Sequence, residues 1–216
     1  MKILALVLLM FSSAAEFASA QAVAIGAFGG VSLIDPTTGR NSGGNHDESR
    51  IYIVGPSVEV RLPAGFAIEA DGLYQRLGNT INYQLLSAIG SFGSEAVGLT
   101  NRLRANMWQF PVLGKYYFRH DSTGWQPFIG SGWAFRFAEV HQAGVETTVD
   151  GAGVLSSFSF KDSFRSDLEV GAVFAAGVRY QMGRFAFSPQ VRYTRWGGQS
   201  NIFRKNEAAA GLGISF

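Results

Sequence analysis

The sequence predicts an all-β fold, an eight-stranded antiparallel up-and-down transmembrane β-barrel preceded by a cleaved signal peptide. Composition gives the first reason, since 47% of the 216 residues are hydrophobic, only 16% are charged, and 27 glycines disfavour a helical bundle. The second reason is a repeated alternation of apolar and polar residues, and the third is a regular succession of long and short connections.

Residues 1–20 have the three parts of a secretory signal peptide. Lys2 supplies a basic start, residues 3–11 are apolar, and Ala18-Ser19-Ala20 is a small-residue cleavage site. Nine apolar residues at ~1.5 Å each are too few to cross a hydrocarbon core of ~30 Å, which disfavours a membrane anchor. We expect cleavage at this site, which leaves residues 21–216 as the predicted β-barrel domain.

The rest of the chain has no stretch of 18 consecutive apolar residues, so a membrane-spanning form would have to be a barrel. Eight segments instead alternate in polarity with the period of two that strands require. They cover approximately residues 22–34, 51–62, 65–77, 104–118, 126–137, 168–181, 184–196 and 207–216.

The connections between these segments alternate in length. All the long ones fall at one end of the predicted sheet and all the short ones at the other, which is typical of outer-membrane barrels. The long connections are residues 35–50, 78–103, 138–167 and 197–206, and the short ones are 63–64, 119–125 and 182–183.

Each segment has one face with charged or small residues and one face with apolar residues. A soluble lipocalin-like barrel would show the same alternation with its charged face in water. We favour charges inside, because 16% charge is low against the usual ~25% and because a narrow barrel has little room for aromatic rings. The predicted inward ionic residues are Glu59, Glu69, Asp71, Glu169 and Glu207 together with Arg61, Lys115, Arg136, Arg179 and Arg192.

These acidic and basic residues are equal in number, so they can neutralise one another. Buried ions are tolerated when they are paired and hydrogen-bonded. We therefore expect a salt-bridge network that fills the lumen and closes any continuous channel.

Aromatic residues near the segment ends fit interfacial girdles, in which a ring lies against lipid and its polar atom reaches water. They are Tyr52, Tyr74, Trp108, Trp125, Trp133, Tyr180 and Trp196. Four residues fit the pattern badly. Pro56, Pro111 and Pro189 each remove a donor from a strand, which predicts bulges or strand ends, and Leu73 falls on the charged face.

The C-terminal Leu212-Gly213-Ile214-Ser215-Phe216 resembles the signal by which outer-membrane barrels engage their assembly machinery. The segments 25–31, 108–116 and 188–194 are similar to the small outer-membrane β-barrel domain family, related in shape to OmpA and OmpX. The resemblance covers the mature chain and implies a place in the bacterial outer membrane. It also implies contact with outer-membrane lipids and lipopolysaccharide, and recognition of Leu212, Ile214 and Phe216 by the assembly machinery.

Several functions are disfavoured by the residues themselves. With no cysteine, the chain has no disulfides or thiolate sites, and its charge of +2 is spread too evenly to bind nucleic acid. Ser200 has no histidine near it in sequence, and His46, His120 and His141 lie in connections without metal-ligand spacing. We expect no enzymatic activity and no cofactor.

We therefore predict a monomeric integral outer-membrane protein with a structural or surface-interaction role. A narrow porin-like channel for small solutes is one alternative, and a periplasmic lipocalin-like binding protein is a second. The long connection 138–167 is charged enough to contact ions, lipopolysaccharide or a protein. Its charged or titratable residues are Glu139, His141, Glu146, Asp150, Lys161, Asp162 and Arg165.

Overall fold

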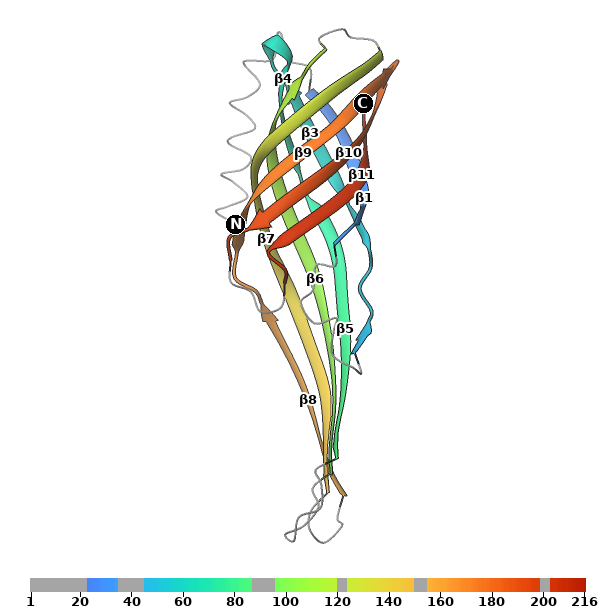
Figure 1. Cartoon of the computed structure of the whole chain (residues 1–216), viewed down its shortest axis with the longest axis vertical. Helices are drawn as coiled ribbons and strands as arrows, with labels where there is room; N and C mark the ends of the chain where they lie inside the picture. The colour runs from blue at the N-terminus through green and yellow to red at the C-terminus, as the bar shows by residue number, and fades with distance from the viewer. Residues whose placement is uncertain (1–22, 35–44, 87–95, 120–123, 150–154, 199–202) are drawn as a thin grey trace.

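The structure, a computed structural model, describes residues 23–34, 45–86, 96–119, 124–149, 155–198 and 203–216. Figure 1 shows tilted strands that form a barrel and continue at one end into a long, narrow ribbon. The predicted signal peptide, residues 1–20, lies outside the described residues. No helix among the described residues is long and apolar enough to cross a membrane.

The barrel closes because β1 pairs with β3 on one side and with β11 on the other, and all pairings are antiparallel. This confirms the predicted eight-stranded antiparallel barrel. The strands are β1 (Val23–Ser32), β2 (Asn45–Asp47), β3 (Tyr52–Arg61), β4 (Phe66–Asp71), β5 (Leu73–Leu86), β6 (Ala96–Tyr117), β7 (Gly124–Val149), β8 (Leu155–Arg165), β9 (Glu169–Met182), β10 (Phe185–Trp196) and β11 (Asn206–Ser215).

The eleven strands occupy eight positions around the barrel wall, because three of them extend or continue others; we call each of these eight positions a stave. β4 and β5 form one stave interrupted at Gly72, and their register against β6 is unchanged across the break. β9 pairs with the first half of β7 and β8 with its second half, so both lie along the same side of β7. β2 extends the sheet beside β5.

The predicted boundaries of two long connections are wrong. Much of 78–103 and 138–167 is strand, since β5 and β6 pair as far as Leu86 and Ala96, and β7 and β8 as far as Val149 and Leu155. Continuing the ladder satisfies the backbone N–H and C=O groups of what would otherwise be a long loop. We call this extension of β5, β6, β7 and β8 the ribbon. The end of the barrel that carries it is the ribbon end, and the other end is the turn end.

The turn end has tight connections. A single 3₁₀ turn at Pro63–Gly65 joins β3 to β4, with left-handed backbone at Ala64 (φ 60°) and Gly65 (φ 79°). The turn between β9 and β10 contains Gly183 at φ 62°. Chain reversal in so few residues needs these positive φ angles.

The three prolines do not produce bulges, contrary to expectation. Pro56, Pro111 and Pro189 lie inside β3, β6 and β10, and the register with the neighbouring strand is continuous through each of them. The ladder on the other flank of each proline is interrupted. Pro189 has no paired residue on β9, and Pro56 and Pro111 have none on β4 or β5, beside the break at Gly72. The local cost of a missing donor is therefore confined to one flank of a proline rather than spread through a shifted strand.

Leu73 lies on the inner face, as its position predicts, without any irregularity in register. It is 3% exposed and packs with Phe28, Ile53 and Ala209. The lumen thus holds apolar clusters between its ionic residues, and the charged inner face of the prediction is incomplete in this respect.

Some glycines allow neighbouring staves to lie close together. A Cβ added to Gly26 would lie 2.0 Å from the Ile214 carbonyl oxygen, at the seam where β1 meets β11. A Cβ at Gly132 would lie 1.9 Å from the Val112 carbonyl oxygen on β6. These contacts are with backbone, so a side chain there would push the wall apart.

Candidate functional site

The inner face of the barrel carries the ionic residues. Lys115 and Arg136 are 1% and 2% exposed, whereas the outward Trp133 is 63% exposed. Arg61 is half-buried near the turn end. The predicted inward residues that the structure buries are Glu59, Glu69, Asp71, Lys115, Arg136, Glu169, Arg179, Arg192 and Glu207.

The first ionic network lies in the turn-end half of the lumen and centres on Glu59. Its Oε1 accepts a hydrogen bond from Arg179 at 2.9 Å and lies 3.5 Å from Arg61 Nε. Its Oε2 lies 3.2 Å from Lys115 Nζ and accepts a hydrogen bond from the Tyr117 hydroxyl at 2.8 Å. Both carboxylate oxygens are therefore satisfied.

The same network continues through Glu69. Lys115 Nζ also donates to Glu69 Oε2, and Arg192 donates to Glu69 Oε1 at 3.0 Å and to Asp71 Oδ2 at 2.5 Å. The guanidinium of Arg192 additionally lies 4.1 Å from the Phe28 ring centroid. Three carboxylates and four cations are thus connected, with a formal charge of +1.

The second network lies nearer the ribbon end and centres on Arg136. Its Nη2 and Nε donate to Glu169 Oε2 at 2.6 and 2.9 Å, and its Nη1 lies 3.9 Å from Glu207 Oε2. Glu207 also accepts hydrogen bonds from Gln109 Nε2 at 2.8 Å and from Trp196 Nε1 at 3.1 Å. One cation and two carboxylates give a formal charge of −1, which balances the first network.

Trp196 is not part of a girdle, and that prediction is wrong. It is 2% exposed inside the barrel, where Arg136 lies 4.3 Å from its ring centroid. It lies on the inner face of β10 with Arg192 and Thr194. The alternation along β10 therefore predicts that Trp196 faces the lumen, because residues two apart in a strand share a face.

Other predicted girdle residues form outward pairs at two levels, which we call the two aromatic belts. Tyr74 lies 5.2 Å from Trp108 towards the ribbon end, and Trp125 lies 4.9 Å from Tyr180 at the turn end. Trp108 is opposite Phe137, twelve residues from Trp125 along β7. Twelve residues at ~3.3 Å and a tilt of ~40° give a height of roughly 30 Å, which matches a hydrocarbon core.

A cavity of about 20 Å³ separates the two networks. Arg192 and Glu207 line it from the two sides, together with Gln109 and Thr194. That volume fits one water molecule and not an apolar ligand of the lipocalin kind. Buried Asp71 Oδ1 and Arg192 Nε have no hydrogen-bond partner among the described atoms.

Two of the three histidines lie among the described residues. His141 is exposed on the outer face of β7, and His46 lies on β2. His120, Asp150 and Ser200 lie outside the described residues. Within the described part of the chain, no group of three or more His, Cys, Asp or Glu residues could hold a metal ion.

The predicted C-terminal signal lies on the outer face of β11. Leu212, Ile214 and Phe216 are 39%, 42% and 68% exposed. The backbones of Phe216 and Ile25 exchange two hydrogen bonds of 3.0 and 3.1 Å. The last residue therefore belongs to the seam that closes the barrel.

Several solved structures are similar to this chain at low sequence identity. Among solved structures, the N-terminal β-barrel domain of OprF from Pseudomonas aeruginosa is 14% identical, with a TM-score of 0.41, and the match covers 90% of this chain and 96% of that one. Neisserial surface protein A (NspA) is 12% identical over 91% and 98% of the two chains, with a TM-score of 0.41. Ail, the attachment invasion locus protein of Yersinia pestis, is 9% identical over 91% and 97%, with a TM-score of 0.40.

No curated protein matches the sequence closely enough to be counted as a relative. A sequence profile described as outer membrane protein beta-barrel domain matches residues 16–204. Because this match covers most of the chain, the protein belongs to the outer membrane protein β-barrel domain family.

Proposed function

We propose that this outer-membrane β-barrel protein resides in the bacterial outer membrane as a monomer with a closed lumen, and that it has a structural or surface-interaction role. Residues 1–20 are its signal peptide and 21–216 its barrel domain. One observation carries the closed lumen: ionic and polar side chains join staves that lie on opposite sides of the barrel.

Three such connections cross the lumen at successive levels. Glu59 on β3 pairs with Arg179 on β9, and these staves are four positions apart in a ring of eight. Asp71 on β4 pairs with Arg192 on β10, and these staves are again opposite. The third connection, between Gln109 on β6 and Glu207 on β11, also joins opposite staves. Side chains that span the diameter leave no room for a continuous water column.

A narrow channel for small solutes is the competing function. The purified protein in a planar bilayer is expected to give no steady single-channel openings. Steady ohmic openings under the same conditions would show that the networks leave a conducting path, and would refute the closed lumen.

A surface-interaction role is supported by the length of the ribbon. In β6, Ala96 lies twelve residues beyond Trp108 of the aromatic belt, which corresponds to roughly 40 Å of strand. Such a ribbon extends past the headgroup layer and presents its side chains outside the cell. Fractionation into the outer membrane with heat-modifiable gel mobility tests the location. The orientation is tested on intact cells by labelling the variant Ser159→Cys with an impermeant thiol reagent, since Ser159 is exposed.

The proposed partners follow from the same placement. Outer-membrane lipids contact the outward apolar wall, and the assembly machinery recognises Leu212, Ile214 and Phe216. We assign no reaction to the protein, because the ionic residues of the lumen are engaged with one another rather than with a nucleophile. Hydrolysis of lipid A acyl chains by the purified barrel would contradict a purely structural role.

A further inference from the structure

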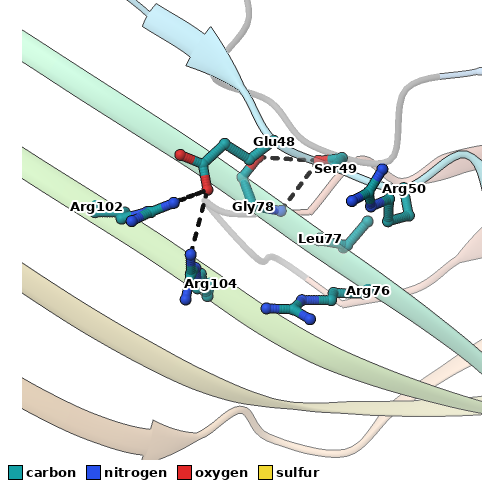
Figure 2. Close-up of a pocket in the computed structure, with 8 residues that line it drawn as sticks. All are labelled: Glu48, Ser49, Arg50, Arg76, Leu77, Gly78, Arg102 and Arg104. Carbon is teal, nitrogen blue, oxygen red and sulfur yellow. Dashed lines mark hydrogen bonds and ion pairs between the residues drawn. The ribbon is translucent and has the colours of Figure 1, made fainter.

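Figure 2 shows a pocket on the outer face of the barrel wall, where the ribbon begins. Its volume is about 440 Å³. Four arginines line it, Arg50, Arg76, Arg102 and Arg104, together with the single carboxylate of Glu48. This concentration of positive charge lies outside the lumen networks and has no part in closing the barrel.

The pocket is built by the segment that leads into β3. This segment runs along β5, since the backbone N–H of Glu48 donates to the Gly78 carbonyl and that of Arg50 to the Arg76 carbonyl, each at 2.9 Å. Arg50 on this segment and Arg76 on β5 are therefore directly opposite each other. Gly78 leaves room for Glu48, because a Cβ at Gly78 would lie 3.0 Å from the Glu48 Cβ.

The charges of the pocket are not balanced. Glu48 accepts hydrogen bonds from Arg102 at 2.6 and 3.1 Å and lies 3.8 Å from Arg104. No carboxylate among the described residues pairs with Arg50 or Arg76. Like charges on directly opposite residues destabilise a sheet, so folding alone does not account for this arrangement. An anion between the guanidinium groups would relieve the repulsion.

Glu48 does not lose its charge near neutral pH. The hydrogen bond from Arg102 lowers the pKa of the Glu48 carboxyl below its ordinary 4.5. A group with a lowered pKa contributes its ion pair above its ordinary pKa and loses it as pH falls through the lowered value. With the Glu48 carboxylate ionised, the formal charge of the pocket is +3.

The position of the pocket indicates what kind of anion it meets. Arg76 is two residues beyond Tyr74, which pairs with Trp108 in the aromatic belt. Two residues correspond to ~7 Å along the strand, so the guanidinium groups lie at the level of lipid headgroups. Arg104 is diagonal to Arg76 across β5 and β6, a separation of ~7–8 Å that lets both side chains reach one phosphate.

We infer that this pocket binds a phosphate monoester carried on a lipid headgroup of the outer leaflet, with Arg76 and Arg104 as its principal ligands. The inference rests on the proposed function, because it requires the aromatic belt to lie in the membrane. Guanidinium groups suit this ligand, since each offers paired N–H donors that match phosphate oxygens.

The test uses the full mature barrel in uncharged detergent, titrated with bisphosphorylated lipid A and followed by native mass spectrometry. The double variant Arg76→Gln/Arg104→Gln is expected to bind at least about tenfold more weakly, the loss that follows from even one charge-assisted hydrogen bond. Arg119→Gln/Arg184→Gln is the matched control, because it removes two exposed arginines at the turn end. This control is expected to bind like the wild type.

Two further ligands identify the source of the phosphate. Lipid A from which both phosphates have been removed is expected to bind at least about tenfold more weakly than the bisphosphorylated form. Inorganic phosphate at the concentration of the lipid is expected not to displace it. Equal binding of the dephosphorylated lipid, displacement by inorganic phosphate, or equal loss in the control variant would each overturn the inference.

Heat-modifiable mobility is measured on the same samples, so that the two proposals can fail separately. If every variant is heat-modifiable and all bind alike, the phosphate site is refuted while the membrane barrel stands. If the wild type itself does not form a heat-modifiable barrel, the proposed function is refuted and the phosphate site with it.

Discussion

Replacing Arg136 by methionine tests whether the ionic interior stabilises the barrel by pairing or merely fills space. Arg136 is 2% exposed and contacts Glu169 at 2.6 and 2.9 Å and Glu207 at 3.9 Å. These two carboxylates are 9% and 4% exposed and have no other cation within ion-pair distance among the described residues. Arg136→Met would therefore leave two buried negative charges without a counter-ion.

The expected loss is ~3–5 kcal/mol, the usual cost of removing one partner of a buried ion pair. The origin of the loss can be separated from the lost packing. Arg136→Met/Glu169→Gln/Glu207→Gln removes all three charges together and should recover more than half of the loss, because a neutral replacement of a buried ionic group is often close to neutral in stability.

The assay is reversible urea unfolding of the barrel in lipid vesicles, followed by tryptophan fluorescence. Arg165→Met is the matched control, since Arg165 also lies over an aromatic ring, 4.0 Å from the Phe137 centroid, but is exposed. Its expected effect is ~1 kcal/mol or less. If the single and triple variants of Arg136 are equally unstable, unpaired charge is not the cause and the reasoning from pairing is refuted.

Three further predictions concern the wall of the barrel, and urea unfolding or folding yield measures each of them. Gly26→Ala should destabilise the seam by ~1–3 kcal/mol, whereas Gly29→Ala in the same strand should be silent, because a Cβ lies 2.0 Å from a carbonyl oxygen in the first case and within 4 Å of nothing in the second; equal midpoints would contradict the close approach. Val112→Arg should cost ~2–4 kcal/mol in a bilayer, since Val112 is outward and 43% exposed between the two belts, and a loss of under 1 kcal/mol would argue against lipid contact there. Ile214→Asp should lower the yield of assembled barrel in cells more than it lowers stability in vitro, and an equal effect on both would show that β11 acts only as a strand.

The face that each strand turns inward was predictable because side chains alternate with a period of two. Glu69 and Asp71 share a face wherever the strand ends, so errors in its boundaries did not affect their assignment. The ion pairs themselves were not predictable. Glu59 and Arg179 are 120 residues apart, and their contact depends on the stagger of the strands around the whole barrel.

The ribbon and its pocket were missed for a related reason. Arg102 and Arg104 were assigned to the end of a long connection or the start of a strand, since polar residues there hide the alternation that marks a membrane strand. Glu48 and Arg50 reach the pocket only through their pairing with Gly78 and Arg76. Nothing in the local sequence of residues 35–50 specifies that register.

The ionic interior has a second consequence, because the residues that close the lumen also fix the register of the strands. A slip of one residue in β10 would turn Arg192 to lipid, at ~2–4 kcal/mol near the bilayer midplane, and would place Val191 and Tyr193 in the lumen. The slip would also separate Arg192 from Asp71 and Glu69, leaving two buried carboxylates without this partner. Pairing across the diameter therefore couples opposite staves, so an error of register in one stave is penalised in another. An apolar interior of equal volume would fill the barrel but would lack this coupling.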